Sequence, residues 1–150
     1  MQPCSPSPDG KTVEISLAPD LSSLAALAGI IQEFGAANAL SDAVRNRLNL
    51  MLDELVTNSI TYGLDKISDP ELRLRLHVDE GAVVAQLEDN GTAFNPFEEA
   101  PEPDPTLGLE ERPIGGLGVF LVKQFADSTA YERVDGRNRI TLRHLIGGES

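Results

Sequence analysis

The sequence has very few of the residues that build disulfides and metal sites. It contains one cysteine and two histidines in 150 residues. Cys4 alone cannot form a disulfide within the chain, and with only the distant His77 and His144 it offers little material for a zinc site. We therefore interpret both histidines as ordinary strand residues.

Long apolar runs are also missing. No stretch approaches the roughly 20 apolar residues that a membrane-spanning helix needs. The first ten residues, MQPCSPSPDG, lack the basic and apolar regions of a secretory signal. These two observations predict a cytoplasmic protein.

Positive charge is scarce as well. The chain has 12 Lys and Arg against 24 Asp and Glu, which gives a formal net charge of −12. Nucleic-acid-binding proteins neutralise phosphates with clustered lysines and arginines, so the charge argues against direct binding of DNA or RNA. It also argues against docking on an anionic membrane. A basic surface on a partner protein would suit this chain better.

The residue pattern predicts one α+β domain over 12–150, after a flexible tail at 1–11 that is rich in Pro, Ser and Gly. We expect a two-layer sandwich, with a mixed, mostly antiparallel sheet covered on one face by about three helices. Alternation of apolar and polar residues predicts strands at 12–17 and 72–78, and three further strands fit 82–87, 129–134 and 139–145. Two of the links between strands, 79–81 and 135–136, carry hairpin signals.

Helical periodicity predicts three helices. The first begins at Asp20 or Ser22, and the second runs from Ser41 or Asp42 to about Tyr62, with Gly63 as its stop. The third begins at Leu117, after a long acidic and proline-rich stretch at 95–113 that fits no regular element and contains at most a helical turn at 107–109. The inward faces are predicted to be Leu24, Leu27, Ala28, Ile31 and Phe34 in the first helix, Val44, Leu48, Leu52, Leu55, Val56, Ser59 and Ile60 in the second, and Leu117, Leu121, Val122 and Phe125 in the third.

Glu54 and Asn58 are the first pair that could carry chemistry. They lie four residues apart on the second helix, so they project from the same face at the margin of its apolar stripe. A carboxylate there could act as general base, and the amide oxygen of Asn58 could ligate Mg²⁺. The alternative for this pair alone is a solvated helix face.

Asp89 and Gly91 form a second candidate, at the end of the strand that precedes the long loop. Asn90-Gly91 is typical of a tight hairpin, but the acidic, proline-rich run that follows cannot supply a pairing strand. The strand therefore ends in a carboxylate and a glycine that open onto the loop. Such a carboxylate can accept a hydrogen bond from the exocyclic amine of adenine, while the glycine lets the base approach the backbone.

A third candidate is the glycine cluster that opens the third helix, Gly115-Gly116-Leu117-Gly118. Bare N–H groups and the dipole at a helix N-terminus favour an anion, so phosphate binding is the functional interpretation. A flexible joint between loop and helix is the alternative. The cluster is neither a P-loop nor a Rossmann fingerprint, because the lysine of the first and the preceding strand of the second are absent.

The order of these three motifs resembles the N, G1 and G2 boxes of the GHKL superfamily of Bergerat-fold ATPases, which includes histidine kinases, gyrase B and MutL. The segments LNLMLDELVTNSITYG, LEDNGTAFNPF and GGLGVFLVKQFAD are similar to those of the anti-sigma-factor serine kinases. The resemblance spans Val13 to Leu145. It implies an ATP-binding domain whose lid over the nucleotide lies at about 95–115.

The resemblance also implies roles for individual residues. Glu54 is the expected general base, and Asn58 the expected Mg²⁺ ligand. Asp89 and Gly91 are expected at the adenine. Phosphate contacts are expected from the lid residue Arg112 and from Gly116, Leu117 and Gly118, and Thr141 is expected to help Asp89 hold the base through water.

The function implied is that of an anti-sigma regulatory factor. Such a protein binds ATP and Mg²⁺, phosphorylates a serine on an anti-sigma-factor antagonist of the STAS type, and controls a sigma factor by partner switching. A homodimer is part of this resemblance. Two alternatives remain: a non-catalytic ATP-binding module that sequesters partners, and an ATPase domain of the histidine-kinase type.

Overall fold

A five-stranded sheet forms one layer of the described part of the protein. The computed structural model describes residues 11–99 and 122–146. The strands lie in the order β1-β2-β3-β5-β4, and each neighbouring pair is antiparallel. The five predicted strands are confirmed, with ends shifted by at most two residues: β1 (Val13–Leu17), β2 (Leu72–Asp79), β3 (Ala82–Asp89), β4 (Ser128–Val134) and β5 (Arg137–Leu145).

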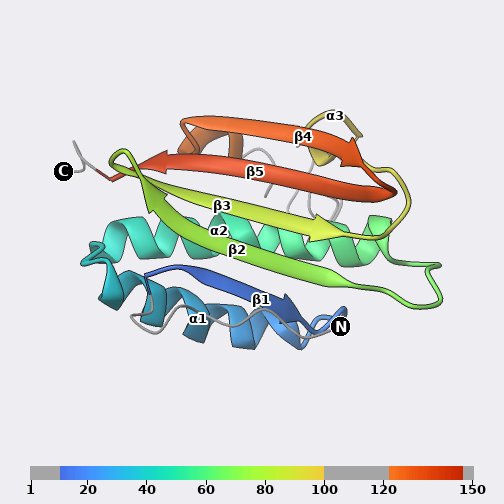
Figure 1. Cartoon of the computed structure of the whole chain (residues 1–150), viewed down its shortest axis with the longest axis horizontal. Helices are drawn as coiled ribbons and strands as arrows, with labels where there is room; N and C mark the ends of the chain where they lie inside the picture. The colour runs from blue at the N-terminus through green and yellow to red at the C-terminus, as the bar shows by residue number, and fades with distance from the viewer. Residues whose placement is uncertain (1–10, 100–121, 147–150) are drawn as a thin grey trace, which may run out of the picture.

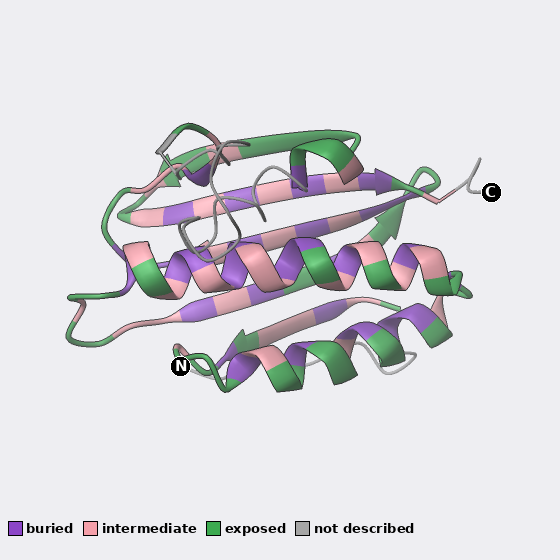
Figure 2. Cartoon of the chain, turned by 180° about the vertical axis from the view of Figure 1, so that it is seen from behind, coloured by how far each residue is buried: buried purple, intermediate pink, exposed green. Residues whose placement is uncertain are grey.

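Two long helices form the other layer and cover one face of this sheet (Figure 1). They are α1 (Ser23–Ala37) and α2 (Asp42–Asn58). In the view from behind, their buried stripes face the sheet, while the outer sides of both helices are exposed (Figure 2). The predicted α+β fold, a sheet with helices on one face, is therefore confirmed. The expected mixed pairing is not seen, since every described pair is antiparallel.

Alternation decides which side chains of β2 enter the core. Leu72, Leu74 and Leu76 are buried, whereas Arg73 and Arg75 lie on the opposite, uncovered face. Successive side chains of a strand point to opposite faces, so one apolar row meets the helices and one polar row meets water. This uncovered side is called the outer face below, and the side under α1 and α2 the inner face.

Both predicted hairpins are present. Glu80-Gly81 joins β2 to β3, and Asp135-Gly136 joins β4 to β5. The φ angles are 50° and 76° in the first turn and 52° and 76° in the second. Two positive φ values define the type I′ turn, whose twist matches that of antiparallel strands and whose second position favours glycine.

The second helix begins where predicted and ends differently. The Ser41 side chain accepts a hydrogen bond from the Val44 N–H (3.2 Å), as an N-cap residue should. However, α2 ends at Asn58, and a wider π-helical turn, η1 (Ser59–Gly63), continues it. This turn closes with a bond from Leu64 N–H to the Ser59 carbonyl (2.8 Å). Single π turns often mark functional sites.

Two further details differ from the predictions. Ala28, predicted on the inward face of α1, is exposed. The apolar residues of that face that are fully buried are Leu27, Ile31 and Phe34. A short helix, α3 (Pro96–Glu99), forms inside the stretch expected to be irregular. The Asn95 side chain accepts a hydrogen bond from the Phe97 N–H (3.0 Å). Pro96 suits the first position of the helix, because the N–H that proline lacks would have no partner within the helix there.

The third predicted helix is described only at 122–125, where Val122 is fully buried and Phe125 packs against the core, as expected. Its start at Leu117, Leu121 and most of the expected lid lie outside the described residues, as does Cys4. Both histidines are strand residues, His77 in β2 and His144 in β5, as predicted. None of the helices in the described segments combines the length and apolar character of a membrane span.

Candidate functional site

Asn58 is the most unusual polar residue of α2. It is 1% exposed, and neither its Nδ2 nor its Oδ1 has a hydrogen-bond partner among the described residues. Burying an amide without partners costs free energy, so native proteins usually pair such groups. The orphaned amide therefore fits a ligand that completes it. Its oxygen suits Mg²⁺, which favours oxygen ligands and often takes only one or two from the protein.

Glu54 lies one helical turn before Asn58 and is half-buried. Burial raises the pKa of its carboxyl group above the ordinary value, and the neighbouring Asp53 carboxylate raises this pKa further. Burial also raises the pKa of Asp53, and this effect outweighs a hydrogen bond from Asn49 that lowers the same pKa. A carboxylate with a raised pKa is a better proton acceptor at neutral pH, as a general base requires.

Asp89 ends β3 on the inner face and is 2% exposed. Its Oδ1 accepts two hydrogen bonds, from the Gly91 N–H (2.8 Å) and from Asn138 Nδ2 (2.9 Å). Both donors approach the same oxygen, so the orientation of the carboxylate is fixed. No described residue donates a hydrogen bond to the other oxygen, Oδ2.

A glycine–glycine contact joins the end of η1 to the end of β3. The Gly63 carbonyl accepts from the Thr92 N–H (2.8 Å). A Cβ added to Gly91 would lie 2.2 Å from the Gly63 oxygen, and one added to Gly63 would lie 3.4 Å from Asp89 Oδ1. Nearby, the rings of Tyr62 and Phe94 stack with centroids 4.9 Å apart. The helix that carries Glu54 and Asn58 thus meets the loop that follows Asp89.

Sequence reasoning missed Asn138, which this site depends on. Asn138 is 2% exposed, is paired with Asp89 across β3 and β5, and donates to Asp89 Oδ1. It also donates to the Thr92 carbonyl (2.8 Å) and accepts from the Phe94 N–H (3.1 Å). One signal was available: Asn138 is in phase with the apolar Ile140 and Leu142, and a polar residue in an inward row needs partners.

Thr141, expected beside Asp89, lies elsewhere. It is separated from Asn138 by three positions on β5, so its side chain is on the outer face. There it is paired with Gln86, whose Nε2 donates to its hydroxyl (3.3 Å). The structure therefore does not bring Thr141 to the inner face. The other expected phosphate contacts, Arg112, Gly116, Leu117 and Gly118, lie outside the described residues.

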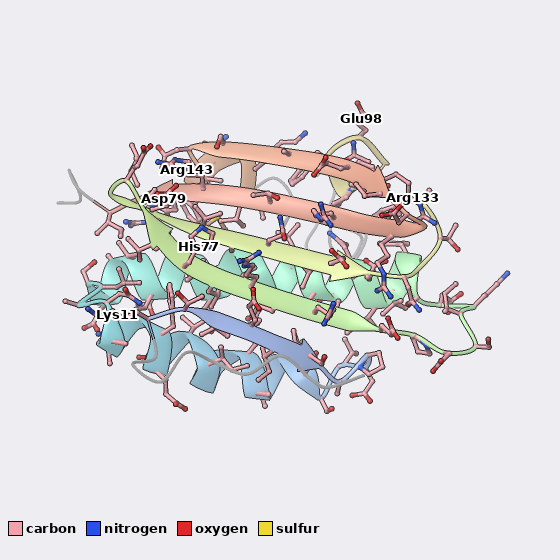
Figure 3. The ribbon with its side chains drawn as sticks, in the orientation of Figure 1. Lys11, His77, Asp79, Glu98, Arg133 and Arg143 are labelled. Atoms are coloured by element: carbon pink, nitrogen blue, oxygen red, sulfur yellow. The ribbon has the colours of Figure 1, made fainter. Side chains whose placement is uncertain are left out.

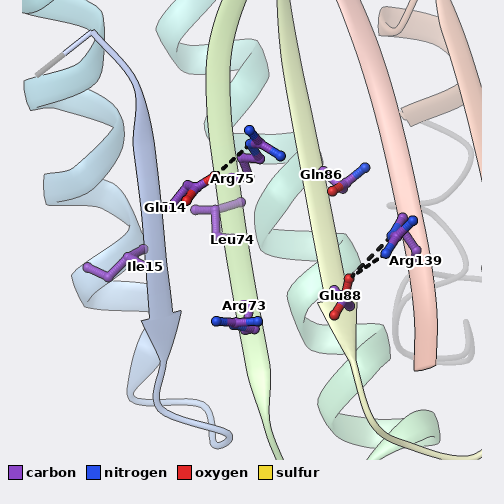
Figure 4. A pocket seen from close by; sticks show the side chains of 8 residues that line it. All are labelled: Glu14, Ile15, Arg73, Leu74, Arg75, Gln86, Glu88 and Arg139. Atoms are coloured by element: carbon purple, nitrogen blue, oxygen red, sulfur yellow. Dashed lines mark hydrogen bonds and ion pairs between the residues drawn. The ribbon is translucent and has the colours of Figure 1, made fainter. Parts of the chain in front are cut away.

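The outer face carries a shallow hollow of its own, of about 220 Å³ (Figure 4). Four of its polar residues form ion pairs across the strands, Glu14 with Arg75 (2.9 Å) and Glu88 with Arg139 (3.2 Å). Glu54, Asn58 and Asp89 do not line it. Within 11–99 and 122–146, no cluster of three or more His, Cys, Asp or Glu residues forms a metal site.

Comparison with curated proteins finds two kinds of relative. Serine/threonine-protein kinase BtrW of Bordetella bronchiseptica is 29% identical over 110 residues, which cover 73% of this chain and 77% of that protein. Serine-protein kinase RsbW of Listeria innocua is 27% identical over 143 residues, which cover 91% of this chain and 88% of that protein.

Among solved structures, the blue-light-activated histidine kinase of Erythrobacter litoralis is similar, with a TM-score of 0.59 over 85% of this chain and 42% of that one. A separate structure of its histidine kinase domain gives a TM-score of 0.54 over 84% of this chain and 60% of that one. At 16% identity these likenesses show the fold alone. A family model, the histidine kinase-like ATPase domain, matches residues 17–144. The chain therefore belongs to the family of histidine kinase-like ATPase domains.

Proposed function

We propose that this protein is a cytoplasmic anti-sigma regulatory factor with serine kinase activity. It binds ATP with Mg²⁺, phosphorylates a serine of an anti-sigma-factor antagonist, and so decides whether it holds the antagonist or a sigma factor. The observation that carries the proposal is the buried, unpartnered amide of Asn58, one turn from a base with a raised pKa. The kinase names of the relatives support it.

Binding is assigned to three groups of residues. Asp89 accepts a hydrogen bond from the adenine amine, through the oxygen that its own neighbours leave free. Asn58 holds Mg²⁺ through its side-chain oxygen. Arg112, Gly116, Leu117 and Gly118 remain our candidates for the phosphates. The net charge of −12 opposes a polyphosphate, so local backbone donors and Mg²⁺ must offset it.

The chemical step is phosphoryl transfer, in which positioning and charge neutralisation contribute most. The serine oxygen forms a bond to the terminal phosphorus of ATP, ADP leaves with the electrons of the broken bond, and the hydroxyl proton passes to the Glu54 carboxylate. Bound Mg²⁺ supplies charge neutralisation on the phosphates. In this step Glu54 accepts the proton, Asn58 orients the metal and Asp89 orients the adenine ring.

Nucleotide binding is tested by replacing Asp89 with asparagine. The new amide oxygen can still accept from Gly91 and Asn138, but Nδ2 would replace the oxygen that accepts the adenine amine. Losing a hydrogen bond to a charged group should weaken ATP binding by about 10–100-fold. At ATP–Mg²⁺ near 100 times the wild-type Kd, we expect wild-type Tm to rise by about 5–10 °C. The Tm of the Asp89→Asn protein should rise by about half as much for a 10-fold loss of affinity, and by about 1–2 °C for a 100-fold loss. An equal rise in both proteins would contradict the assignment.

The pH dependence of phosphotransfer tests the environment of Glu54. Only the ionised carboxylate accepts a proton, so the rate should fall as pH decreases through the pKa of Glu54. Burial and the Asp53 charge raise this pKa, so the fall should begin at a higher pH than for an exposed glutamate. Asp53→Asn removes that charge, and the acid limb should move to lower pH. Rates for both proteins between about pH 4 and 8 check this. If the acid limb of the pH–rate profile does not move, the Asp53 charge does not affect the pKa of Glu54.

Membership of the histidine kinase-like ATPase family favours one other function, ATP-dependent phosphorylation of a histidine. The stability of the product distinguishes the two. After incubation with the antagonist and ATP, a serine kinase leaves an acid-stable phosphate on the antagonist, whereas phosphohistidine is lost in acid. Nucleotide binding without any transfer would identify the protein as a sequestering module instead.

A further inference from the structure

All the hydrogen-bonding groups of Asn138 are engaged. Its Nδ2 donates to Asp89 Oδ1 and to the Thr92 carbonyl, which uses both amide N–H groups. Its Oδ1 accepts from the Phe94 N–H, the Tyr131 hydroxyl and the Arg133 guanidinium. If the amide were flipped, its N–H groups would face the Phe94 N–H and the Arg133 guanidinium, which are themselves donors. The amide therefore fits in one orientation. Asn138 is therefore held with its donor toward Asp89.

The partners of Asn138 come from several segments that meet at one end of the sheet. Tyr131 and Arg133 lie on β4, and Asp89 ends β3. Arg133 also donates to the Gly91 carbonyl (2.7 Å), and its place at this end of the sheet is visible in Figure 3. The loop that follows β3 is thus tied to Asn138 and Arg133 at Gly91, Thr92 and Phe94.

Asn138 leaves Asp89 with a single free acceptor. Oδ1 already receives the Gly91 N–H and Asn138 Nδ2, so Oδ2 is the oxygen that a ligand can use. An acceptor held in one place favours a ligand with an N–H at the matching position. A purine without such a donor would leave a buried carboxylate oxygen unpaired, which is costly.

We propose that Asn138 is a positioning residue that fixes Asp89 to read the exocyclic amine of adenine, and so sets the preference of the site for adenine over purines without that amine. This inference rests on the proposed binding of ATP at Asp89. The donors and acceptor of Asn138 are already engaged, so it acts on adenine through Asp89 and not by a hydrogen bond of its own.

The test is a thermodynamic cycle between a side chain and a ligand group. The Kd of ATP and of purine riboside triphosphate, which lacks only the amine, is measured by calorimetry with Mg²⁺ for wild type and Asn138→Ala. Wild type should prefer ATP by about 10–100-fold. In the variant the preference should fall below about threefold, chiefly through weaker ATP binding. A structural role alone would weaken both ligands equally, and an unchanged preference would overturn the proposal.

Two further proteins complete the design. Thr141→Val changes the same strand on its outer face and should keep the wild-type preference; loss of the preference there would overturn the proposal. If Asn138→Ala does not fold, Asn138→Leu has nearly the same size but lacks the Nδ2 donors, and it should lose the preference too. If wild type binds both triphosphates equally, this inference is wrong while the proposed ATP binding stands. Wild type that binds neither defeats the proposed function as well.

Discussion

Replacing Glu54 with glutamine is expected to lower the rate of serine phosphorylation by about 10²–10⁴-fold, the usual contribution of a general base. Glutamine has nearly the same size and cannot accept the hydroxyl proton. Because the proposal assigns adenine to Asp89 and Mg²⁺ to Asn58, and neither to Glu54, ATP affinity should change little. Single-turnover phosphorylation of the antagonist, with ATP binding measured separately, checks both halves.

The neighbouring carboxylate supplies a matched control for Glu54. Asp53 is also half-buried on α2, and burial also raises its pKa, but its side chain pairs with Asn49 (3.0 Å). Asp53→Asn keeps an oxygen for that bond and should phosphorylate at close to the wild-type rate at neutral pH. A fully active Glu54→Gln protein would remove Glu54 from the mechanism, whereas two equally inactive variants would indicate a general effect of charge on this helix.

Replacing Gly91 with alanine should be the most destabilising of the substitutions considered. The new Cβ would lie 2.2 Å from the Gly63 oxygen and 2.4 Å from its carbonyl carbon, and backbone atoms cannot rotate away. Forced overpacking usually costs about 1–3 kcal/mol, and we expect the upper end of that range or more. The shift must also move the Gly91 N–H, which holds Asp89, so ATP binding should weaken. Denaturant unfolding and calorimetry measure the two effects.

Gly29 provides the control for this substitution. It lies on the exposed side of α1, and a Cβ added there would meet no atom within 4 Å. Glycine in a helix is less favourable than alanine by about 0.5–1 kcal/mol, so Gly29→Ala should stabilise the protein. If Gly91→Ala were as stable as wild type, the close contact between Gly63 and Gly91 would not exist in solution.

Local sequence determined the strands, the hairpins and the cap of α2. Apolar alternation predicted β1 and β2 because one face of the sheet is buried and the other wet, whereas no residue of the edge strand β4 is buried and its hairpin turn indicated it. Asp135-Gly136 is a typical type I′ pair, and in Glu80-Gly81 the glycine supplies the tolerance of positive φ. The four-residue spacing of Glu54 and Asn58 set their common helix face. Each of these depends on interactions within a few residues, which a sequence displays directly.

Tertiary structure alone decided the composition of the site around Asp89. Which residue of β5 faces Asp89 depends on the register between two strands, and that register pairs Asp89 with Asn138. Since successive side chains alternate between faces, a separation of three residues puts Thr141 on the other side of the sheet. The steric need for glycine at 91 likewise arises from Gly63, 28 positions earlier in the chain. Contacts between distant segments have no local signature, so the sequence predicted Asp89 but not the side chain that holds it.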